Sequence, residues 1–494
     1  MRSYRELFPD YADRFQSQSH FLHLVLPSVV RPGEPFALRA VMMDASGMPD
    51  EGYTGRIPLK TGDPALRVPE TLEFTPEDMG RTTVEGLAAE EEGAYHVVAE
   101  PADCPGHPPV SNPCRVRAGG RRLYWGDIHM HTVVGNCHPD TCKSPDFGYW
   151  YAREAALTDF GSATDHLRGI HRLDGNWEEL KRSARQNHQP GRFVTLLAFE
   201  SSHATGYGGD NNIYYGVDEA DFFWKDREDM TGIAPKVGLD ELWAWLDEQG
   251  APYVSIPHHT GRAGKYRDFE NRWHNPERET VLEVFSWWGS SEGRLDDIYL
   301  KDGKSDRRSY WRDALELGHR YGAICSSDTH TTTPATPLTT TPENYHYPQL
   351  RLNAQGVAAI YADELTREGI FESLLNRRCY GTTWWRPVIE FDVSGVKMGR
   401  VGEADARVRE RRAVRASVAT SRPRTQVTLY RNNEPIHHQR IEPGLTQMEF
   451  VDEEPLEEVV LRDAPKSERP FAFYYLKAFW NSHIAWSSPV WLTL

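Results

Sequence analysis

Five apolar runs in the middle of this chain each end in a histidine, an aspartate or a glutamate, and this ordered series is its most constraining feature. The first run reaches His129 and His131, which lie two positions apart, so both imidazoles face the same side of a strand. The later runs end, in chain order, at Asp165-His166, at Glu200, at His258-His259 and at Asp328-Thr329-His330. Such side chains at the ends of successive strands indicate a shared site.

The surrounding pattern favours strands that alternate with helices between residues 123 and 381. Leu239, Leu242, Trp243 and Leu246 repeat at helical spacing, and the apolar run that starts at Tyr253 is typical of the next strand. Alternation over this length predicts a parallel α/β barrel or a doubly wound sheet. In such folds the carboxyl ends of the strands meet at one edge, so we expect the five strand ends to converge.

Both flanks of this region carry β patterns. Short apolar runs separated by Pro- and Gly-rich turns fill residues 21 to 120, which predicts a sandwich-like domain. Strand-like runs return at residues 388–393 and 471–476. We therefore predict three domains: a β-sandwich-like domain over residues 1–120, an α/β domain over residues 121–385 and a second β-sandwich-like domain over residues 386–494.

Imidazoles and carboxylates that meet at one site commonly bind zinc, manganese or iron ions that activate water. A lone His-x-His or Asp-x-His would be a chance feature, whereas five ordered strand ends are hard to assign to ordinary buried polar groups. A single tetrahedral ion takes about four ligands, and the series offers more. We therefore expect two or three clustered divalent ions.

The ordered series resembles the PHP (polymerase and histidinol phosphatase) superfamily of metal-dependent phosphoesterases, over roughly residues 123 to 385. That family carries His-x-His, a ligand in the following loop, Thr-Asp-His, a Glu, two separate His residues and Ser-Asp-x-His. One branch of it also resembles this chain in five short segments: Trp-Gly-Asp-x-His at 125–129, Ile-Pro-His at 256–258, Tyr-Gly-Thr-Thr at 380–383, Val-Lys-Met-Gly at 396–399 and Ala-Trp-Ser-Ser-Pro at 485–489. The resemblance implies an α/β fold, a distorted (β/α)7-like PHP barrel flanked by N- and C-terminal β-sandwich-like domains.

The resemblance also implies a set of metal ligands, in which Glu200 bridges two ions. Two positions depart from the family pattern. The loop ligand should lie among Asn136, Cys137, His138 and Asp140; we choose His138, on which the third ion depends. The family's next histidine is replaced by Asp210, with His203 as the competing candidate. The implied ligands are His129, His131, His138, His166, Glu200, Asp210, His258, Asp328 and His330.

The expected activity is that of a metal-dependent hydrolase, most simply a phosphoesterase that uses water activated at a di- or trinuclear site. His259 or His203 would protonate the leaving oxygen. Arg168, Arg262 and Lys265 follow ligand positions and would bind the anionic group of a small-molecule substrate, with solvated loop charges as the alternative. Hydrolysis of an amide or a lactone on the same ions is a rival hypothesis, and a catalytically silent binding protein is another.

The overall charge narrows the choice of partners. Asp and Glu outnumber Lys and Arg by 72 to 56, and the net charge of −16 argues against binding of long nucleic acid.

The N-terminus lacks an apolar signal segment, and no early stretch approaches the ~20 apolar residues that span a bilayer. We therefore expect a cytoplasmic protein without membrane association; the sequence leaves its oligomeric state open.

Overall fold

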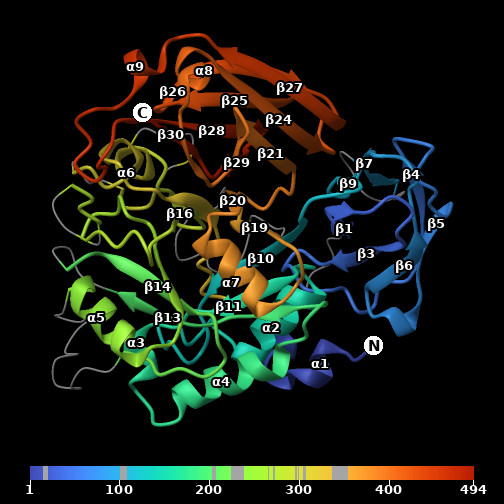
Figure 1. Ribbon diagram of the computed structural model, residues 1–494. Coiled ribbons are helices and arrows are strands. Elements are labelled where there is room, and N and C mark those ends of the chain that lie inside the picture. Colours follow the sequence, from blue (N-terminus) through green and yellow to red (C-terminus); the bar gives the residue numbers. More distant parts are fainter. Residues whose placement is uncertain are drawn as a thin grey trace.

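Three parts of the chain are visible in the computed structural model, which Figure 1 colours from blue to red along the sequence. The blue N-terminal part and the C-terminal part, which ends in red, flank a central part that runs from cyan through green and yellow to orange. The structure describes residues 1–14, 21–100, 108–202, 207–223, 238–264, 266–270, 273–294, 298, 300–303, 307–336 and 354–494.

Three-stranded sheets build the N-terminal part. Burial alternates along β4, where Ile57 and Leu59 are buried between exposed neighbours, so one face of the strand joins a core that includes Leu38, Leu72 and Val97. The sheets, in strand order, are β1 (Phe21–Val25), β3 (Phe36–Met43) and β6 (Arg81–Leu87); β2 (Val29–Val30), β9 (Cys114–Val116) and β7 (Gly93–Tyr95); and β5 (Thr71–Phe74), β4 (Gly55–Thr61) and β8 (Val97–Ala99). The short helices are α1 (Tyr4–Leu7), η1 (Pro9–Arg14) and η2 (Pro76–Asp78).

The central part is organised around buried strands in three groups. Strands β11, β13, β15 and β16 are buried along their whole length, including the polar residues at the end of β13. The groups are β12 (Val194–Thr195), β11 (Phe160–Ala163), β10 (Arg122–Met130), β19 (Val357–Ala362) and β20 (Cys379–Thr382); β13 (Leu197–Ser202), β14 (Asp210–Tyr215) and β15 (Tyr253–Pro257); and β17 (Gly289–Ser290), β16 (Val281–Ser286) and β18 (Gly322–Cys325).

Helices cover these strands on the outside (Figure 1). The predicted helix is confirmed as α5, in which Leu239, Leu242, Trp243 and Leu246 are the buried residues. It ends at Gly250, whose φ of 74° is the left-handed conformation that favours glycine at a helix end. The helices of the central part are α2 (Pro145–Glu154), α3 (Leu167–Ile170), α4 (Asn176–Asn187), α5 (Leu239–Gln249), α6 (Trp311–Leu317) and α7 (Arg367–Leu375).

The predicted fold class, a (β/α)7-like barrel, is wrong. Strands hold 39% of the residues and helices 17%, and the strands form many small sheets. Strand β10 pairs parallel with β11 but antiparallel with β19, and β14 pairs antiparallel with both β13 and β15. The physical reason is that an apolar run marks a buried strand without recording the direction of its neighbours. The described ranges therefore form no closed parallel barrel.

The C-terminal part continues the largest sheet of the molecule. Antiparallel pairing of β20 with β29 carries this 11-stranded sheet out of the central part. A four-stranded sheet packs against it. Val414 and Val418 of the four-stranded sheet share a core with Val427 and Leu429 of the 11-stranded sheet. The first sheet adds β29 (His483–Ser487), β28 (Phe471–Trp480), β25 (Thr425–Arg431), β26 (Glu434–Ile441), β30 (Val490–Thr493) and β23 (Val401–Glu403). The second holds β22 (Val396–Lys397), β21 (Val388–Val393), β24 (Arg412–Thr420) and β27 (Gly444–Asp452), with α8 (Ala406–Glu410) and α9 (Leu456–Val459) beside them.

Candidate metal centre

The strand ends named by the sequence do converge, although the strands around them belong to separate sheets. Three isolated parallel bridges connect the ends: Met130 with Thr329, His166 with Glu200, and His258 with Glu283. The convergence therefore depends on short backbone contacts between small sheets rather than on a continuous barrel.

Four overlapping groups of possible ligands result, and within each group the ligand atoms lie within 4.8 Å of one another. Nearly all the sequence-predicted ligands belong to them, together with His259, which we expected to be a proton donor. The groups are His129, His131 and Asp328; His129, Glu200 and His258; Asp210, His258 and His259; and His131, Cys137, His166 and His330.

Asp328 and Glu200 hold the middle of the cluster. The Oδ1 atom of Asp328 lies 3.3 Å from His129 Nε2 and 3.1 Å from His131 Nε2. The two oxygens of Glu200 face different neighbours: Oε2 lies 2.9 Å from His166 Nδ1, and Oε1 lies 3.4 Å from His258 Nε2. A carboxylate placed this way can serve two neighbouring ions.

Several buried ligand atoms lack a hydrogen-bond partner among the residues that the structure describes. Both ring nitrogens of His258 are in this position, as are Nδ1 of His259, Nδ1 of His131 and Oδ2 of Asp328. Each such atom costs about 1–3 kcal/mol when it stays unsatisfied. So many in one cluster fit a site that binds cations, because divalent ions would satisfy ring nitrogens and carboxylate oxygens together.

The ionisable side chains of the cluster shift one another's pKa values. Burial disfavours the charged form of His129, yet Asp328 and Glu283 outweigh it and hold the pKa of His129 well above its ordinary value. Burial likewise opposes ionisation of Asp328 and Glu200, but the neighbouring imidazoles hold the pKa of both carboxyls well below the ordinary range. Burial, followed by repulsion from His330 and His166, lowers the pKa of His131 to about 3. Ionised carboxylates beside a neutral imidazole are the protonation states that metal ligands need.

Two buried aspartates fix the backbone that carries the ligands. Asp127 accepts hydrogen bonds from the backbone N–H of His129, Ser327 and Ala335, at 3.1, 3.0 and 2.7 Å, and so ties β10 to the loop after β18. Asp165 holds the loop after β10 by accepting from the N–H groups of Thr132 and Gly135. The motif residues beside the ligands thus have a structural role of their own.

The backbone at two candidate ligands is strained. Asp328 has a φ of 54° and His259 a φ of 31°, and both are non-glycine residues in the left-handed region. Such conformations cost on the order of 1–3 kcal/mol and persist where the surroundings determine them, most often at functional sites.

Glu283 is a functional candidate that the sequence reasoning missed. His129 Nδ1 donates to Glu283 Oε2 at 2.9 Å, and Ser326 Oγ donates to the same oxygen. This contact orients the ring so that Nε2 faces the cluster, which is how carboxylates commonly position metal-binding histidines. The sequence did carry one sign of this role: a charged residue stands inside the otherwise mostly apolar segment Val-Leu-Glu-Val-Phe-Ser at residues 281–286.

Cys137, rather than His138, belongs to the outer group with His131, His166 and His330. The His138 ring packs edge-on against His330 at a centroid distance of 4.8 Å. Hydrogen bonding with Cys142 and the proximity of His330 and His166 overcome burial and hold the pKa of the Cys137 thiol below its ordinary value. Both residues lie in the loop to which the sequence assigned one ligand.

Arg262, for which the sequence predicts contact with an anionic group, packs on an aromatic ring next to the cluster. Its guanidinium is 4.7 Å from the centroid of Trp288, and Lys301 Nζ lies 5.5 Å from the same centroid. Trp288 in turn contacts the ring of His330, with 5.7 Å between centroids. Two cations thus border the outer group. Arg262 also lies 3.7 Å from Asp302, which Lys301 contacts as well.

The remaining predicted residues have different positions. Arg168 is half-buried on α3, two residues after His166, and pairs with none of the described residues. The expected proton donor His259 donates to Asp210 Oδ2 at 2.7 Å and lies 3.5 Å from Asp328, inside the ligand cluster. His203 and Lys265 lie outside the described residues.

No family model matches this chain. It is 27% identical over 381 residues to an uncharacterised protein of Chlamydia pneumoniae, a match that covers 75% of this chain and 57% of that protein. It is 26% identical over 251 residues to an uncharacterised protein of Chlamydia trachomatis, covering 49% of this chain and 38% of that protein. The chain thus spans about half or less of the length of these curated relatives.

Solved structures offer only distant similarities. Trypsin-activated alpha-2-macroglobulin from Escherichia coli matches 96% of this chain and 24% of its own, with 10% identity and a TM-score of 0.18. PhoD matches 35% of this chain and 38% of its own, with 13% identity and a TM-score of 0.16. A cycloisomaltooligosaccharide glucanotransferase of Paenibacillus sp. matches 94% and 71%, with 8% identity and a TM-score of 0.23. These scores are too low to support a shared fold.

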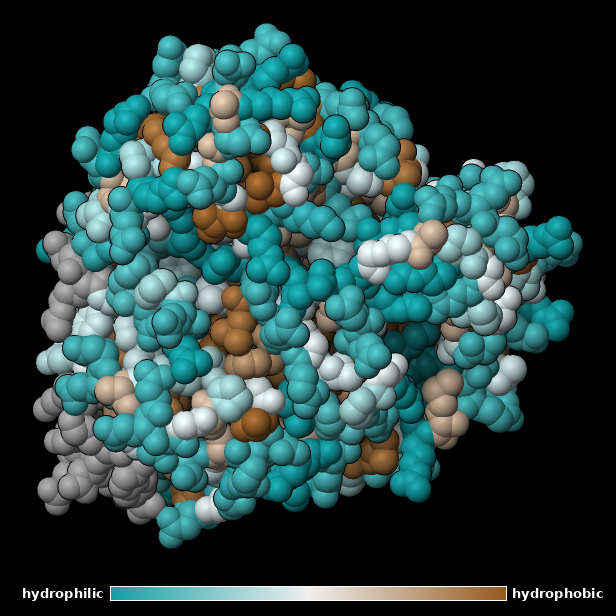
Figure 2. All heavy atoms as spheres, in the orientation of Figure 1, coloured by the Kyte–Doolittle hydropathy of each residue, from teal (hydrophilic) through white to brown (hydrophobic). Residues whose placement is uncertain are grey.

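The face of the molecule in Figure 2 is covered mainly by hydrophilic residues, with hydrophobic ones scattered among them. None of the helices in the described part of the chain combines the length and the hydrophobicity that a membrane-spanning helix requires.

Proposed function

We propose that this chain is a metal-dependent hydrolase, and that its substrates are small phosphate esters. The observation that carries the proposal is the convergence of the four ligand groups on one cluster, in which several ring nitrogens and carboxylate oxygens lack a hydrogen-bond partner among the described residues. The order of these ligands along the chain resembles that of the PHP superfamily, apart from the loop ligand and Asp210, and this resemblance supports the same chemistry.

The residues suit two or three divalent ions. His129, His131 and Asp328 would hold one, Glu200 would join it to a second near His258 and Asp210, and Cys137, His166 and His330 would hold a third. When bound, such ions polarise a phosphoryl oxygen and lower the pKa of water. Glu283 keeps the His129 ring turned towards the cluster, and Asp127 keeps the two ligand loops in register.

The cations at the edge of the cluster favour an anionic substrate. Arg262 and Lys301 lie on Trp288, next to His330, where a phosphoryl group could contact them. Arg262 can engage two oxygens of one phosphate through its planar guanidinium. His259, held by Asp210, can hold or release a proton at Nε2, and this contact orients its ring.

The test combines elemental analysis with activity. Purified protein reconstituted with Mn²⁺, Zn²⁺ or Fe²⁺ is assayed on phosphomonoesters and phosphodiesters, with an amide and a lactone as comparison substrates. We expect at least two equivalents of metal and phosphoester turnover that disappears with a chelator and returns with metal. Less than one equivalent after reconstitution would contradict the metal site. Turnover of the amide or lactone alone would contradict the substrate class.

Cys137→Ser is expected to remove about one equivalent of metal, because a hydroxyl is a much weaker ligand than a thiolate. In protein loaded with Co²⁺, the same substitution should abolish the sulfur-to-cobalt charge-transfer absorption. His138→Ala is the matched control in the same loop, and it should keep both the metal and the absorption band. If His138→Ala loses the metal and Cys137→Ser keeps it, the outer ligand is His138 as the sequence suggested.

A further inference from the structure

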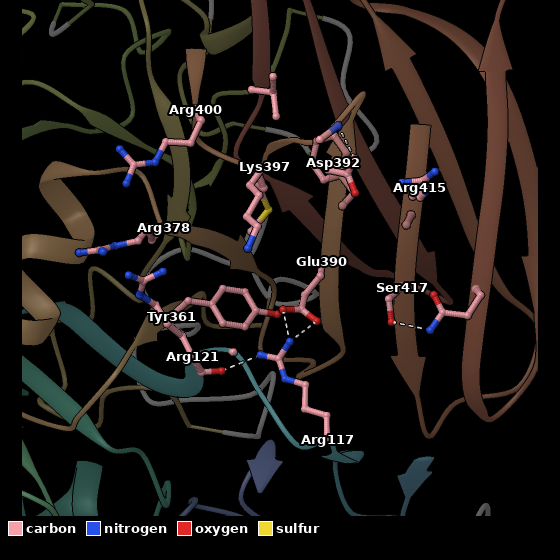
Figure 3. Close-up of a pocket in the computed structure, with 17 residues that line it drawn as sticks. Arg117, Arg121, Tyr361, Arg378, Glu390, Asp392, Lys397, Arg400, Arg415 and Ser417 are labelled. Carbon is pink, nitrogen blue, oxygen red and sulfur yellow. Dashed lines mark hydrogen bonds and ion pairs between the residues drawn. The ribbon is translucent and has the colours of Figure 1, made fainter. Parts of the chain in front are cut away.

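A cavity lies far from the metal centre, where the central and C-terminal parts meet. It has a volume of about 680 Å³, within the range of small-molecule sites. Figure 3 shows its side chains, which come from the segment before β10, from β19, from the residue before β20, from the region of β21 and β22, and from β24 and β27. The segment Val-Lys-Met-Gly at residues 396–399, which the metal centre does not use, forms part of its wall.

The lining of this cavity is strongly basic, although the chain as a whole carries a net charge of −16. Six lining residues are cationic and only Glu390 and Asp392 are acidic. Both acids are already engaged: Glu390 accepts two hydrogen bonds from Arg117, at 2.6 and 2.7 Å, and Asp392 accepts one from the backbone N–H of Gly395. The cations are Arg117, Arg121, Arg378, Lys397, Arg400 and Arg415.

Two of these cations have no carboxylate partner among the residues that the structure describes. Lys397 makes no ion pair there, and the guanidinium of Arg400 donates to the neutral side chain of Asn376, at 3.1 Å. Three others pair with carboxylates that are 65% to 81% exposed: Arg121 with Asp363, Arg378 with Glu372, and Arg415 with Glu449. Exposed pairs of this kind contribute little stability, so these cations can turn to a ligand at little cost.

The turn that carries Lys397 and Arg400 is fixed in place. The N–H of Arg400 donates to the carbonyl of Lys397 at 3.0 Å, and Arg377 Nε donates to the carbonyl of Gly399 at 3.0 Å. Gly399 has a φ of 82°, and a Cβ there would lie 2.1 Å from the carbonyl oxygen of Arg377. The turn therefore requires glycine, and its fixed backbone sets the positions from which the Lys397 and Arg400 side chains extend.

We propose that this cavity binds a small organic anion that carries two or more phosphate groups, such as a nucleoside diphosphate. Cations on several sides of the cavity suit an extended charge better than a single carboxylate. The Tyr361 ring lies between Arg121 and the Glu390–Arg117 pair in Figure 3, and offers an apolar surface to the organic part of the ligand.

This site is independent of the proposed hydrolase activity. Arg121 precedes the first residue of β10, whereas His129 lies near the other end of that strand and His131 just beyond it. At about 3.3 Å per residue, the two ends are roughly 25–30 Å apart. An anion in the cavity would therefore not contact the candidate metal ligands.

Isothermal titration calorimetry with ADP, pyrophosphate and uncharged adenosine tests the proposal. We expect ADP to bind, pyrophosphate to bind more weakly, and adenosine to show no binding. The double variant Lys397→Gln/Arg400→Gln should weaken ADP binding by about tenfold or more. Arg440→Gln, on β26 outside the cavity, is the matched control and should bind as the wild type does, since Arg440 is likewise exposed.

Binding at the metal centre is separated from binding in the cavity by Asp328→Ala, which should keep its affinity for ADP. Equal ADP affinity in the double variant and the wild type would overturn the proposal, as would loss of ADP binding in Asp328→Ala alone. Absence of ADP binding by the wild type at millimolar concentration would also overturn it. Unchanged circular dichroism of the double variant would show that the fold is intact.

Discussion

Asp328→Ala is expected to reduce phosphoester turnover by at least about 100-fold and to lower the metal content by at least one equivalent. The reason is the position of the carboxylate, whose Oδ1 lies within 3.3 Å of both His129 and His131. Without it, the group of His129, His131 and Asp328 keeps its two imidazoles and loses its anionic ligand. The measurements are elemental analysis and steady-state turnover on the same preparation.

Glu442→Ala provides the control for that substitution, because Glu442 is an acidic residue at the surface, 63% exposed and remote from the cluster. It should leave metal content and turnover unchanged. Near-wild-type turnover of Asp328→Ala would show that Asp328 is not a ligand that the reaction needs. Circular dichroism should report an intact fold for both variants, since the sheets of the flanking parts do not depend on this side chain.

Asp452→Ala is expected to lower the free energy of unfolding of the C-terminal part by about 3–5 kcal/mol. Asp452 accepts from Tyr474 Oη at 2.7 Å and pairs with Arg431 at 2.8 Å and with Arg412 at 3.0 Å. The Arg412 side chain is completely buried, so its charge would lose its compensating carboxylate. Urea denaturation followed by tryptophan fluorescence measures the change.

Glu454→Ala is the matched control, because Glu454 contacts Arg431 at 3.0 Å but is 64% exposed. It should cost at most about 1 kcal/mol. Similar losses in the two variants would contradict the idea that burial of Arg412 sets the cost.

The same network predicts a dependence of stability on pH. Burial opposes ionisation of Asp452, but the hydrogen bond from Tyr474 and the charge of Arg412 prevail and lower its pKa below 3.8. A carboxyl with a lowered pKa in the folded state stabilises the fold above the unfolded pKa, and this contribution is lost as the pH falls. The wild type should therefore lose stability below about pH 4, and Asp452→Asn should lose less.

The convergence of the candidate ligands was more predictable than the fold. Side-chain alternation on a strand is a local property, so His129 and His131 could be assigned to one face without any knowledge of the neighbouring strands. Strand direction is not local: β14 separates β13 from β15 and pairs antiparallel with both, and its sequence Asp-Asn-Asn-Ile-Tyr-Tyr carries no sign of this. The barrel prediction was wrong for that reason.

Loop residues were the hardest to assign. The sequence offered Asn136, Cys137, His138 and Asp140 for one loop ligand, and His138 was chosen, but the loop held by Asp165 places Cys137 in the outer group. Nor could spacing along the chain identify Glu283, because its contact with His129 joins residues 154 positions apart.

The joint between β20 and β29 has a consequence for how this protein could have been assembled. Domains joined by a linker can be exchanged between genes, because each keeps its own hydrogen bonds when the linker is cut. Here the joint is a β-ladder, in which Tyr380, Gly381 and Thr382 pair with Ser487, Trp486 and Ala485. Separation would leave an open strand edge on each side, and such edges promote aggregation. The central and C-terminal parts are therefore expected to be inherited as one unit.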